Sequence, residues 1–373
     1  MPTSMRYNRL MKLKEYLALR RTHLADYLEK FISDEEKRAG NQLSDVALER
    51  LAEFSTKGKM LRGIFVMLGY EMFSPLSEKE HITSDQKYAH EDVLHVAVAM
   101  ELSHAAILIH DDIMDNDRTR RGDTTMFAHY AEDAAKHNIE NTDEYGKSMA
   151  MIVADAGLFL TYELLGDVSV DGEIRSRIMK KYSSEMLKIC LGQFMDYHFG
   201  KTPQERSSDE IQRMYQLKTG SYTFTLPLML GAYMAGKVDE ELTHLEEISA
   251  HLGEVFQMKD DELGIFGDST QTGKPVGADI AENKKTLFRA ALFDAATNVE
   301  KRDLENIFGQ SLTDENVKYV QKLLEKYDIR ENMQKRVDRH SEAAHFLLSN
   351  LSLSEEYSSL FKELIDYNRF RGA

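Results

Sequence analysis

Cysteine, tryptophan and proline are scarce in this 373-residue chain, which has one Cys, no Trp and five Pro. The lone Cys190 excludes an intrachain disulfide framework and any Cys-x-x-Cys metal site. Few prolines leave long uninterrupted segments, which favour helices. No apolar run reaches the length of a membrane span, since even residues 93–109 contain His95, Glu101 and His104. The first residues also lack the apolar core of a signal peptide, so we expect a cytoplasmic protein without a transmembrane segment.

Positive charge is in deficit as well. The 47 Lys and Arg residues are outnumbered by 63 Asp and Glu residues, which gives a net charge of −16. Such a balance argues against a general nucleic-acid binder. An anionic substrate must therefore be bound by a local cluster of cationic side chains, against the field of the whole protein.

The apolar residues recur at helical spacing along most of the chain, and they show no strand-like alternation. We expect an all-α protein. One domain should span residues 1–373, with a peripheral N-terminal helix region (1–42), a catalytic core (43–300) and C-terminal helices (301–373). The expected helices are 8–31, 45–54, 61–75, 93–115, 147–165, 174–199, 208–234 and 240–263, with four or five more between 282 and 370.

Between these helices we expect irregular segments. Residues 78–91 resemble a polar linker, 116–125 and 264–279 resemble loops, and 132–144 resembles a charged surface excursion. Pro227 should kink the helix that contains it, because proline removes a backbone hydrogen bond.

One apolar stretch leads directly into three carboxylates. Residues 105–110 are followed by Asp111, Asp112 and Asp115, and on a helix Asp111 and Asp115 lie one turn apart on the same face. Carboxylates this close repel one another, and a hard cation such as Mg²⁺ relieves the repulsion while bridging to substrate phosphates. Taken alone, the motif is more typical of a solvated acidic helix end, because acidic clusters are common on an acidic chain.

A second stretch has the same design. Residues 255–259 form the end of an apolar helix, and Asp260, Asp261 and Glu262 follow. Two acidic pairs far apart in sequence can face each other across one cavity and hold several Mg²⁺ ions on one diphosphate.

Basic residues stand next to the breaks in helical periodicity. Lys59 and Arg62 lie three apart at a helix start, where backbone amides also favour anions. Taken singly, each Lys or Arg is typical of a solvated surface, and His104 alone is typical of a hydrogen-bonded core histidine. The other members of this set are Arg120, Arg121, Lys218 (followed by Thr219 and Gly220), Lys274 and Lys284.

In this order along the chain, these segments resemble the motifs of the trans-isoprenyl diphosphate synthases, the polyprenyl synthetase family, from Gly58 to about Thr286. The matching segments are Gly58-Lys59-Met60-Leu61-Arg62, Glu101-Leu102-Ser103-His104, Asp111-Asp112-Ile113-Met114-Asp115, Arg120-Arg121-Gly122, Lys218-Thr219-Gly220, Gln257-Met258-Lys259-Asp260-Asp261, Gly273-Lys274-Pro275-Val276-Gly277-Ala278-Asp279 and Glu282-Asn283-Lys284. Any one of them is weak evidence, but the ordered set is specific.

The resemblance implies an isoprenoid synthase-type helical bundle with a central apolar cavity. It also implies a prenyltransferase that joins isopentenyl diphosphate to an allylic diphosphate, and it implies a homodimer. Metal ligands for up to about three Mg²⁺ ions would be Asp111, Asp112, Asp115, Asp260 and Asp261. The catalytic set would be Asp111, Asp112, Asp115, Lys218 and Asp260. Contacts to the allylic diphosphate would come from Arg120, Lys218, Thr219, Gln257, Lys274 and Lys284, and contacts to isopentenyl diphosphate from Lys59, Arg62, His104 and Arg121.

The chain departs from the family pattern at one position. The second acidic motif usually ends in a carboxylate, whereas Gly264 stands there, and Asp268 is one further turn along if the helix continues. This departure puts the far metal site in doubt, and we expect Asp260 to make most of the metal contact.

Product length depends on what lies one turn before Asp111. Ala106 and Ile107 stand there in place of two aromatic rings, and small residues leave room for a longer tail. We therefore expect geranylgeranyl diphosphate, with a farnesyl or longer-chain product as the alternative. Plain helix packing explains Ala106 equally well, and Met151, Phe159 and Leu160 are candidates for a floor at another depth.

Two other function classes are compatible with an acidic metal motif. A class I terpene synthase also ionises an allylic diphosphate, but it needs no second diphosphate site, so Lys59, Arg62 and His104 argue against it. A non-catalytic subunit of a heteromeric synthase should have lost site residues, and only Gly264 fits that description.

Overall fold

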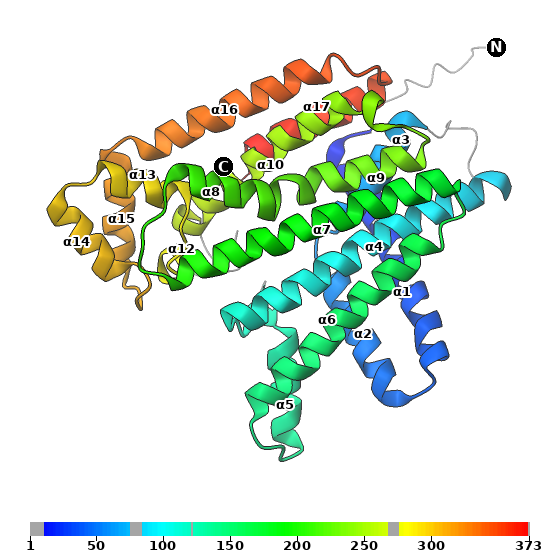
Figure 1. Ribbon diagram of the computed structural model, residues 1–373, viewed down its shortest axis with the longest axis horizontal. Coiled ribbons are helices and arrows are strands. Elements are labelled where there is room, and N and C mark those ends of the chain that lie inside the picture. Colours follow the sequence, from blue (N-terminus) through cyan, green and yellow to red (C-terminus); the bar gives the residue numbers. More distant parts are fainter. Residues whose placement is uncertain (1–10, 75–83, 121, 268–275, 372–373) are drawn as a thin grey trace, which may run out of the picture.

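The computed structural model describes residues 11–74, 84–120, 122–267 and 276–371, and long α-helices make up nearly all of this part (Figure 1). The helices are α1 (Leu13–Ala39), α2 (Gln42–Thr56), α3 (Leu61–Phe73), α4 (Ser84–Asp115), α5 (Met126–Lys136), α6 (Thr142–Gly166), α7 (Gly172–Lys201), α8 (Ser208–Tyr215), the π-helix η1 (Gln216–Thr225), α9 (Leu226–Met234), the 3₁₀-helix η2 (Asp239–Glu241), α10 (Thr243–Phe266), α12 (Ala278–Ala281), α13 (Leu287–Ala295), α14 (Asn298–Ile307), α15 (Asp314–Lys326), α16 (Ile329–Leu348) and α17 (Glu355–Arg369). The all-α prediction is therefore confirmed, and so are the further helices expected after residue 282.

Helix α4 is the central element, and it ends at the first acidic motif. Its apolar residues from Val93 to Ile109 are almost all buried, and it packs against α3 and α6. The prediction of a linker over 78–91 was wrong from Ser84 onward, because α4 already begins there. Residues 84–91 are polar but include good helix formers, so the helix continues beyond the core. Residues 78–83 lie outside the described part of the chain.

Two helices are long and apolar enough to cross a membrane, judged by length and composition alone. They are the Glu91–Asp115 part of α4, whose most apolar window is 72% buried, and α6, whose window is 44% buried. A buried core helix meets the same criterion, and α4 is enclosed by its neighbours. The absence of a transmembrane segment stays a prediction.

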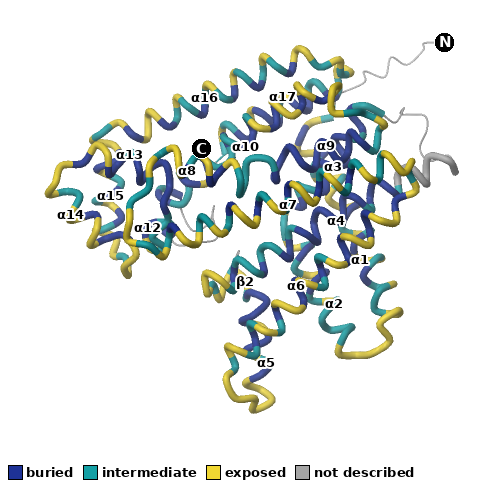
Figure 2. The backbone as a smooth tube through the Cα atoms, in the orientation of Figure 1, coloured by how far each residue is buried: buried dark blue, intermediate teal, exposed yellow. Residues whose placement is uncertain are grey.

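The buried side chains form two main clusters. The larger unites α1, α3, α4, α6, α7 and α9, and the smaller unites α8 with the helices from α13 to α16 (Figure 2). Helix α10 runs between them and packs against η1, α16 and α17. The acidic ends of α4 and α10 therefore lie on helices that belong to one connected bundle.

Two of the segments expected to be irregular are ordered. Strands β1 (Thr119–Arg120) and β2 (Asp123–Thr124) form a small antiparallel hairpin directly after α4, although no strand was predicted. The excursion predicted over 132–144 begins inside α5, whose apolar side chains at helical spacing are buried against α6. Only residues 137–141 form the connection to the next helix.

The helix predicted over 208–234 is irregular, but not in the way we expected. Instead of a kink at Pro227, a π-helical segment occupies Gln216–Thr225, and Pro227 is the second residue of α9. A proline in the first turn removes no needed amide. The wider π-helical turn contains the Lys218-Thr219-Gly220 segment, and such turns are frequent at functional sites.

Close contact with α7 holds this π-helical segment in place. A Cβ added at Gly192 would lie 2.7 Å from the Lys218 Cα and closer still to the Lys218 backbone nitrogen. No side chain fits there unless one of the two backbones moves. The contact therefore sets the distance between α7 and Lys218.

The replacement Gly192→Ala should lower the free energy of unfolding by about 1–3 kcal/mol, because it overpacks this contact. The matched control is Gly200→Ala on the same helix, where an added Cβ would meet no atom within 4 Å. That control should be neutral or stabilising by up to about 1 kcal/mol. Denaturant unfolding of both variants measures the difference, and equal stabilities would show that α7 does not constrain η1.

Candidate active site

The first acidic motif crowds three carboxylates at the C-terminal end of α4. The helix dipole places partial negative charge there, which makes the position unfavourable for further carboxylates. Burial raises the pKa of Asp112 to about 7, although Arg120 opposes the shift. Burial and the neighbouring Asp111 raise the pKa of Asp115 to about 6. A nearby cation would therefore stabilise the charged forms of these two carboxylates at neutral pH.

The hairpin after α4 supplies a cation to this motif. Arg120 donates from Nε to Asp112 Oδ1 at 2.6 Å and from Nη2 to Asp111 Oδ2 at 3.3 Å. The other oxygen of Asp111 accepts a hydrogen bond of 2.8 Å from the Gln193 amide of α7. Asp112 Oδ2 is buried and has no hydrogen-bond partner in the structure. One arginine therefore satisfies the motif only in part.

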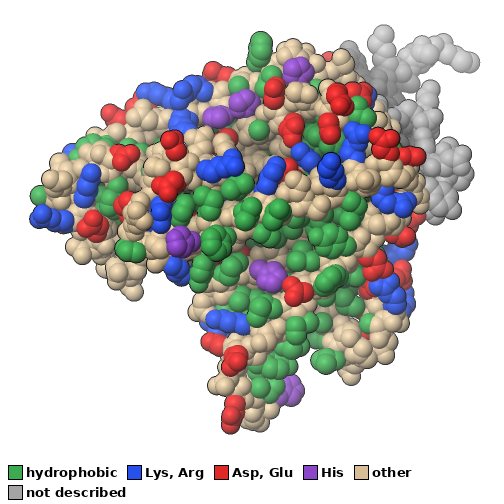
Figure 3. Space-filling model, in the orientation of Figure 1, with side chains coloured by type: hydrophobic (Ala, Val, Ile, Leu, Met, Phe, Trp, Pro, Cys, Tyr) green, Lys and Arg blue, Asp and Glu red, His purple; other side chains and the backbone are tan. Residues whose placement is uncertain are grey.

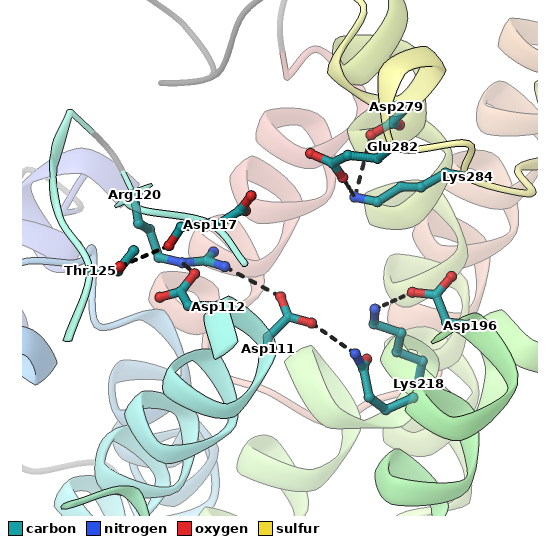
Figure 4. Close-up of polar contacts among 11 residues, drawn as sticks. Asp111, Asp112, Asp117, Arg120, Thr125, Asp196, Lys218, Asp279, Glu282 and Lys284 are labelled. Atoms are coloured by element: carbon teal, nitrogen blue, oxygen red, sulfur yellow. Dashed lines mark hydrogen bonds and ion pairs between the residues drawn. The ribbon is translucent and has the colours of Figure 1, made fainter. Parts of the chain in front are cut away.

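The facing side of the site has cationic side chains (Figure 4). Lys218 from η1 forms an ion pair with Asp196 of α7. Lys284 lies 2.9 Å from Glu282 and 3.5 Å from Asp279, both near α12. Burial alone would lower the pKa of Lys284, but Asp279 and Glu282 outweigh it and hold that pKa above its usual value.

The two sides interact electrostatically. The positive charges of Lys284 and Lys218 oppose the rise in the pKa of Asp115 that burial and Asp111 cause. Asp111 likewise helps Asp196 to raise the pKa of Lys218 against the effect of burial. The first acidic motif and the two lysines are thus close enough to influence one another, and their shared role in binding diphosphate stays a prediction.

Two polar residues at this site were missed by the sequence analysis. Gln193 and Asp196 lie three residues apart in α7, so they share a face, and they contact Asp111 and Lys218. Their i, i+3 spacing inside a predicted helix was the available signal, but such spacing is common on solvated helices.

The three carboxylates of the second acidic motif lie in different environments. Asp260 is exposed and pairs with Arg371 near the C-terminus at 3.2 Å. Asp261 is buried, and it accepts hydrogen bonds from the Tyr215 hydroxyl and from the Gln257 amide. Of this pair, Asp260 is therefore the more open to a metal.

Glu262 faces away from this site. It pairs with Lys259 at 2.6 Å and with Arg330 of α16 at 2.8 Å. The Lys259 contact lies within α10, and the Arg330 contact belongs to the packing of α10 against α16, so the carboxylate of Glu262 is directed away from Asp260 and Asp261.

Two of the four basic residues predicted for the second diphosphate lie around one aromatic ring. Tyr222 of η1 has the Arg62 guanidinium 4.6 Å from its centroid and the His104 ring 6.1 Å away. Arg62 also donates to the Thr223 hydroxyl at 3.1 Å, while its buried Nε has no hydrogen-bond partner in the structure. This arrangement leaves a donor for an anion.

Lys59 does not share a helix face with Arg62, contrary to the prediction. Helix α3 begins only at Leu61, after Met60 in the left-handed conformation at φ 51°. Lys59 instead contacts the Tyr367 hydroxyl of α17 at 3.1 Å. Arg121 and Lys274, also predicted to bind diphosphate, lie outside the described residues, as does Asp268. Thr219 lies in η1 next to Lys218.

Some of the candidates for chain-length control are buried in the protein, and others are exposed on its surface. Ala106 is fully buried on α4 and Ile107 is half-buried. On α6, Leu160 is buried, but Met151 is 42% and Phe159 is 72% exposed. The helical period turns Met151 and Phe159 outward, so the suggestion that they form a floor within this chain was wrong.

The model of one protein family, described as polyprenyl synthetase, matches residues 46–326. The chain belongs to the polyprenyl synthetase family. It is 34% identical over 235 residues to a short chain isoprenyl diphosphate synthase of Methanocaldococcus jannaschii, a match covering 63% of this chain and 66% of that enzyme. It is 30% identical over 258 residues to a geranylgeranyl diphosphate synthase of Saccharolobus solfataricus, covering 69% of each.

A solved structure has the same fold over nearly the whole chain. The geranylgeranyl pyrophosphate synthase of Corynebacterium glutamicum, complexed with isoprenyl diphosphate and magnesium, superposes with a TM-score of 0.85 at 25% identity. The superposition covers 97% of this chain and all of that one. The all-α isoprenyl synthase fold and the prenyltransferase class predicted from the motifs are therefore confirmed.

The donor set fits Mg²⁺, the ion implied by the family. Carboxylate oxygens are its preferred protein ligands. A bound cation would give the buried Asp112 Oδ2 a partner and would lower the raised pKa values of Asp112 and Asp115. In the described part of the chain no three His, Cys, Asp or Glu side chains are yet gathered closely enough to hold a metal.

We expect Mg²⁺ to stabilise this polyprenyl synthetase strongly at pH 8 and weakly at pH 5.5. The raised pKa values mean that Asp112 and Asp115 take up protons as the pH falls through about 7 and about 6. These protons compete with the ion, so its apparent affinity falls with pH. Melting temperatures with and without MgCl₂ across this range provide the measurement.

Asp112→Asn is the matched variant for this pH series, because it keeps the shape of the side chain and removes its titration. Its Mg²⁺ stabilisation should be smaller at pH 8 and should change less with pH. A wild-type shift that stays constant from pH 5.5 to 8 would contradict the assignment of these carboxylates to the metal.

Proposed function

We propose that this protein condenses isopentenyl diphosphate with an allylic diphosphate and releases an all-trans polyprenyl diphosphate, most simply geranylgeranyl diphosphate. One observation supports the proposal: the segment η1 carries parts of two separate basic groups, Lys218 beside the first acidic motif and Tyr222 with Arg62 and His104 around it. Two diphosphate sites are what a condensation needs, whereas a terpene synthase needs one.

The chemistry follows from charge. Diphosphate is a poor leaving group until the negative charge developing on its bridging oxygen is neutralised. Mg²⁺, when bound through Asp111, Asp112, Asp115 and Asp260, supplies Lewis-acid stabilisation of that charge. Lys218, Lys284 and Arg120 add fixed positive charge, and they orient the allylic diphosphate so that its C–O bond breaks toward them.

Breaking that bond leaves an allylic carbocation. The double bond of isopentenyl diphosphate attacks the cation, a proton is lost, and the chain grows by one isoprene unit. Arg62 and His104 would hold the second diphosphate so that this double bond faces the cation. No protein nucleophile or general base is required, because the released diphosphate can accept the proton.

The carbocation must be kept from water, which would convert it to an alcohol. The apolar part of α4 before Asp111 is the natural wall for the growing tail, and Ala106 and Ile107 lie one turn from the motif. The small Ala106 side chain supports a long product. The curated relatives include geranylgeranyl diphosphate synthases, such as that of Saccharolobus solfataricus, and a geranylfarnesyl diphosphate synthase of Aeropyrum pernix.

We also propose a homodimer formed through α6 and α7. Figure 3 shows hydrophobic side chains gathered over these helices in the middle of the view. They recur at helical spacing, and their exposure in a single chain leaves an apolar surface that another copy can cover. The exposed members are Met151, Ile152, Phe159, Tyr162, Leu187, Leu191 and Phe194.

The decisive experiment incubates the purified protein with Mg²⁺, isopentenyl diphosphate and each of dimethylallyl, geranyl and farnesyl diphosphate, with product lipids analysed by chromatography. Elongated prenyl diphosphates would support the proposal. Cyclic hydrocarbons or alcohols formed from the allylic substrate alone would indicate a terpene synthase. Complete inactivity with every starter would indicate a subunit that needs a partner.

In this assay, Asp260→Ala should reduce kcat/KM by orders of magnitude, because Asp260 is the exposed carboxylate of the second motif. Glu262→Ala is the matched control two residues away, and it should cost about tenfold or less, because Glu262 pairs with Lys259 and Arg330. Similar small losses in both variants would mean that Asp260 does not bind the metal.

The substitution Ala106→Phe should shorten the main product, since a ring in place of a methyl group closes the space below the first motif. Ala106→Val provides a graded comparison and should shorten the product less. Chromatography of the extracted lipids gives the result, together with the melting temperature to verify folding. A folded Ala106→Phe enzyme with the wild-type product would remove Ala106 from the channel.

A further inference from the structure

Helices α4 and α7 are joined by side-chain hydrogen bonds at two places. At the first acidic motif, the Gln193 amide donates to Asp111 at 2.8 Å. Deeper in the bundle, the hydroxyl oxygens of Ser103 and Tyr182 lie 2.6 Å apart. With a rise of about 1.5 Å per residue, Ser103 precedes Asp111 by about 12 Å along the axis of α4. The two hydrogen bonds therefore mark the ends of a stretch that begins at the motif.

The side chains between these two hydrogen bonds are apolar and partly accessible. On α4, Ile107 lies one turn from Ser103 and one turn from Asp111. On α7, Met186 lies one turn after Tyr182, toward the first acidic motif. Ile107 and Met186 are half-buried, whereas Ser103 and Tyr182 are fully buried. The accessible surface therefore extends from the motif past Ile107 and Met186, and it ends at the deeper hydrogen bond.

Three buried hydroxyls meet at this end and form the hydroxyl cluster of Ser103, Thr161 and Tyr182. Thr161 of α6 donates to the Gly157 carbonyl at 2.9 Å, and Ser103 donates to Thr161 at 3.3 Å. Ser103 thus accepts from the Tyr182 hydroxyl, and each group donates its one proton. The cluster fastens α4, α6 and α7 together, and opening it would leave buried hydroxyls without partners.

The ring of Tyr182 is the largest group in the hydroxyl cluster. It lies against the Tyr162 ring of α6 with a centroid distance of 5.7 Å and an interplanar angle of 89°. The ring is thus fixed at its hydroxyl by Ser103 and on its side by another aromatic ring. It cannot turn aside without losing both contacts.

We infer that Tyr182 of α7, fastened to Ser103, is the side chain that stops the growing isoprenoid tail and so sets the product length. The inference rests on the proposed function for the identity of this ligand. With the diphosphate at the first acidic motif, the tail would run along the accessible apolar surface of Ile107 and Met186 and would end against the Tyr182 ring. The small Ala106 leaves the tail room, and the stop comes from a helix that does not carry the motif.

A purely structural role for Tyr182 makes a different prediction. Truncating the ring would then lower the stability and leave the preferred tail length unchanged. Tyr16→Ala is the matched control, because Tyr16 is also fully buried and its hydroxyl donates to Glu71 at 2.9 Å, on a helix that carries none of the site residues. It should lower the melting temperature and keep the wild-type preference. Tyr182→Phe keeps the ring, so it should keep that preference as well.

The experiment titrates the full-length protein, at fixed MgCl₂, with non-reactive thiolodiphosphate analogues of geranyl, farnesyl, geranylgeranyl and geranylfarnesyl diphosphate, and it follows binding by isothermal calorimetry. In the wild type, the affinity should fall at least about tenfold at one step of this series, where the tail becomes longer than the space above Tyr182. In Tyr182→Ala this step should move to a longer ligand or disappear. The first ligand that the wild type excludes should then bind at least about tenfold more tightly than it binds to the wild type.

Met186→Phe tests the same stop from the side of the motif. It places a ring one turn nearer the diphosphate, so the step should move to a shorter ligand. Because Met186 is only half-buried, a larger side chain there disturbs the core less than truncation of Tyr182 does. This variant keeps the test informative if Tyr182→Ala folds poorly.

A folded Tyr182→Ala protein with the wild-type step would overturn the inference, and so would a wild type without any step in the series. An equal shift in Tyr16→Ala, or an unchanged step in Met186→Phe, would also contradict it. The titration contains no isopentenyl diphosphate, so it is independent of the condensation assay. A shifted step in a protein that makes no prenyl product would contradict the proposed function and leave this inference standing.

Discussion

The organisation of this protein depends on carboxylates held where carboxylates are least stable. Helix α4 is buried along its apolar length, and it ends in three acids at the negative end of its own dipole. Burial and neighbouring carboxylates disfavour the charged forms of Asp112 and Asp115, and this raises their pKa values. Arg120 relieves it only partly, because one guanidinium cannot reach every oxygen of the motif. Affinity for a divalent ion is therefore built into the fold.

The rest of the site is positioned by close backbone contacts. Lys218 lies on a π-helical turn that meets α7 at Gly192, and Asp279 lies on a short helix that meets α10 at Gly264. At Gly192 the backbone of Lys218 approaches within a distance that any side chain would prevent, whereas at Gly264 the Asp279 carboxylate lies against the helix. The cationic and acidic groups from elements distant in the sequence are in this way fixed around one space.

Much of this could be predicted from the sequence, because the signals were periodic or ordered. The helical spacing of apolar residues predicted the all-α fold, and the order of short motifs predicted the family. The same patterns placed Asp111, Asp112, Lys218 and Lys284 together before any geometry was known. Their residue types carry the chemistry, and helix geometry alone brings Asp111 and Asp112 to one end of α4.

What the sequence did not predict depends on tertiary contacts. Spacing suggested that Lys59 and Arg62 share a face, but the left-handed Met60 separates them. Phe159 was a plausible floor by residue type, and only the packing of α6 shows that it faces outward. Asp261 resembled a metal ligand, yet Tyr215 and Gln257 engage both of its oxygens. Gln193 and Asp196 had no signal beyond a spacing common to many helices.

These contacts also indicate how binding changes the site. Most of the cations described around the site are paired with carboxylates: Arg120 with the first motif, Lys284 with Asp279 and Glu282, and Arg371 with Asp260. If Mg²⁺ neutralised the carboxylates, as in the proposed function, these cations would lose their partners and could turn to the diphosphate oxygens. Metal and diphosphate therefore assist each other, since each removes the charge that opposes the other. The acidic net charge of the protein is then no obstacle to an anionic substrate, because the carboxylates that cause local repulsion are the groups that the metal covers.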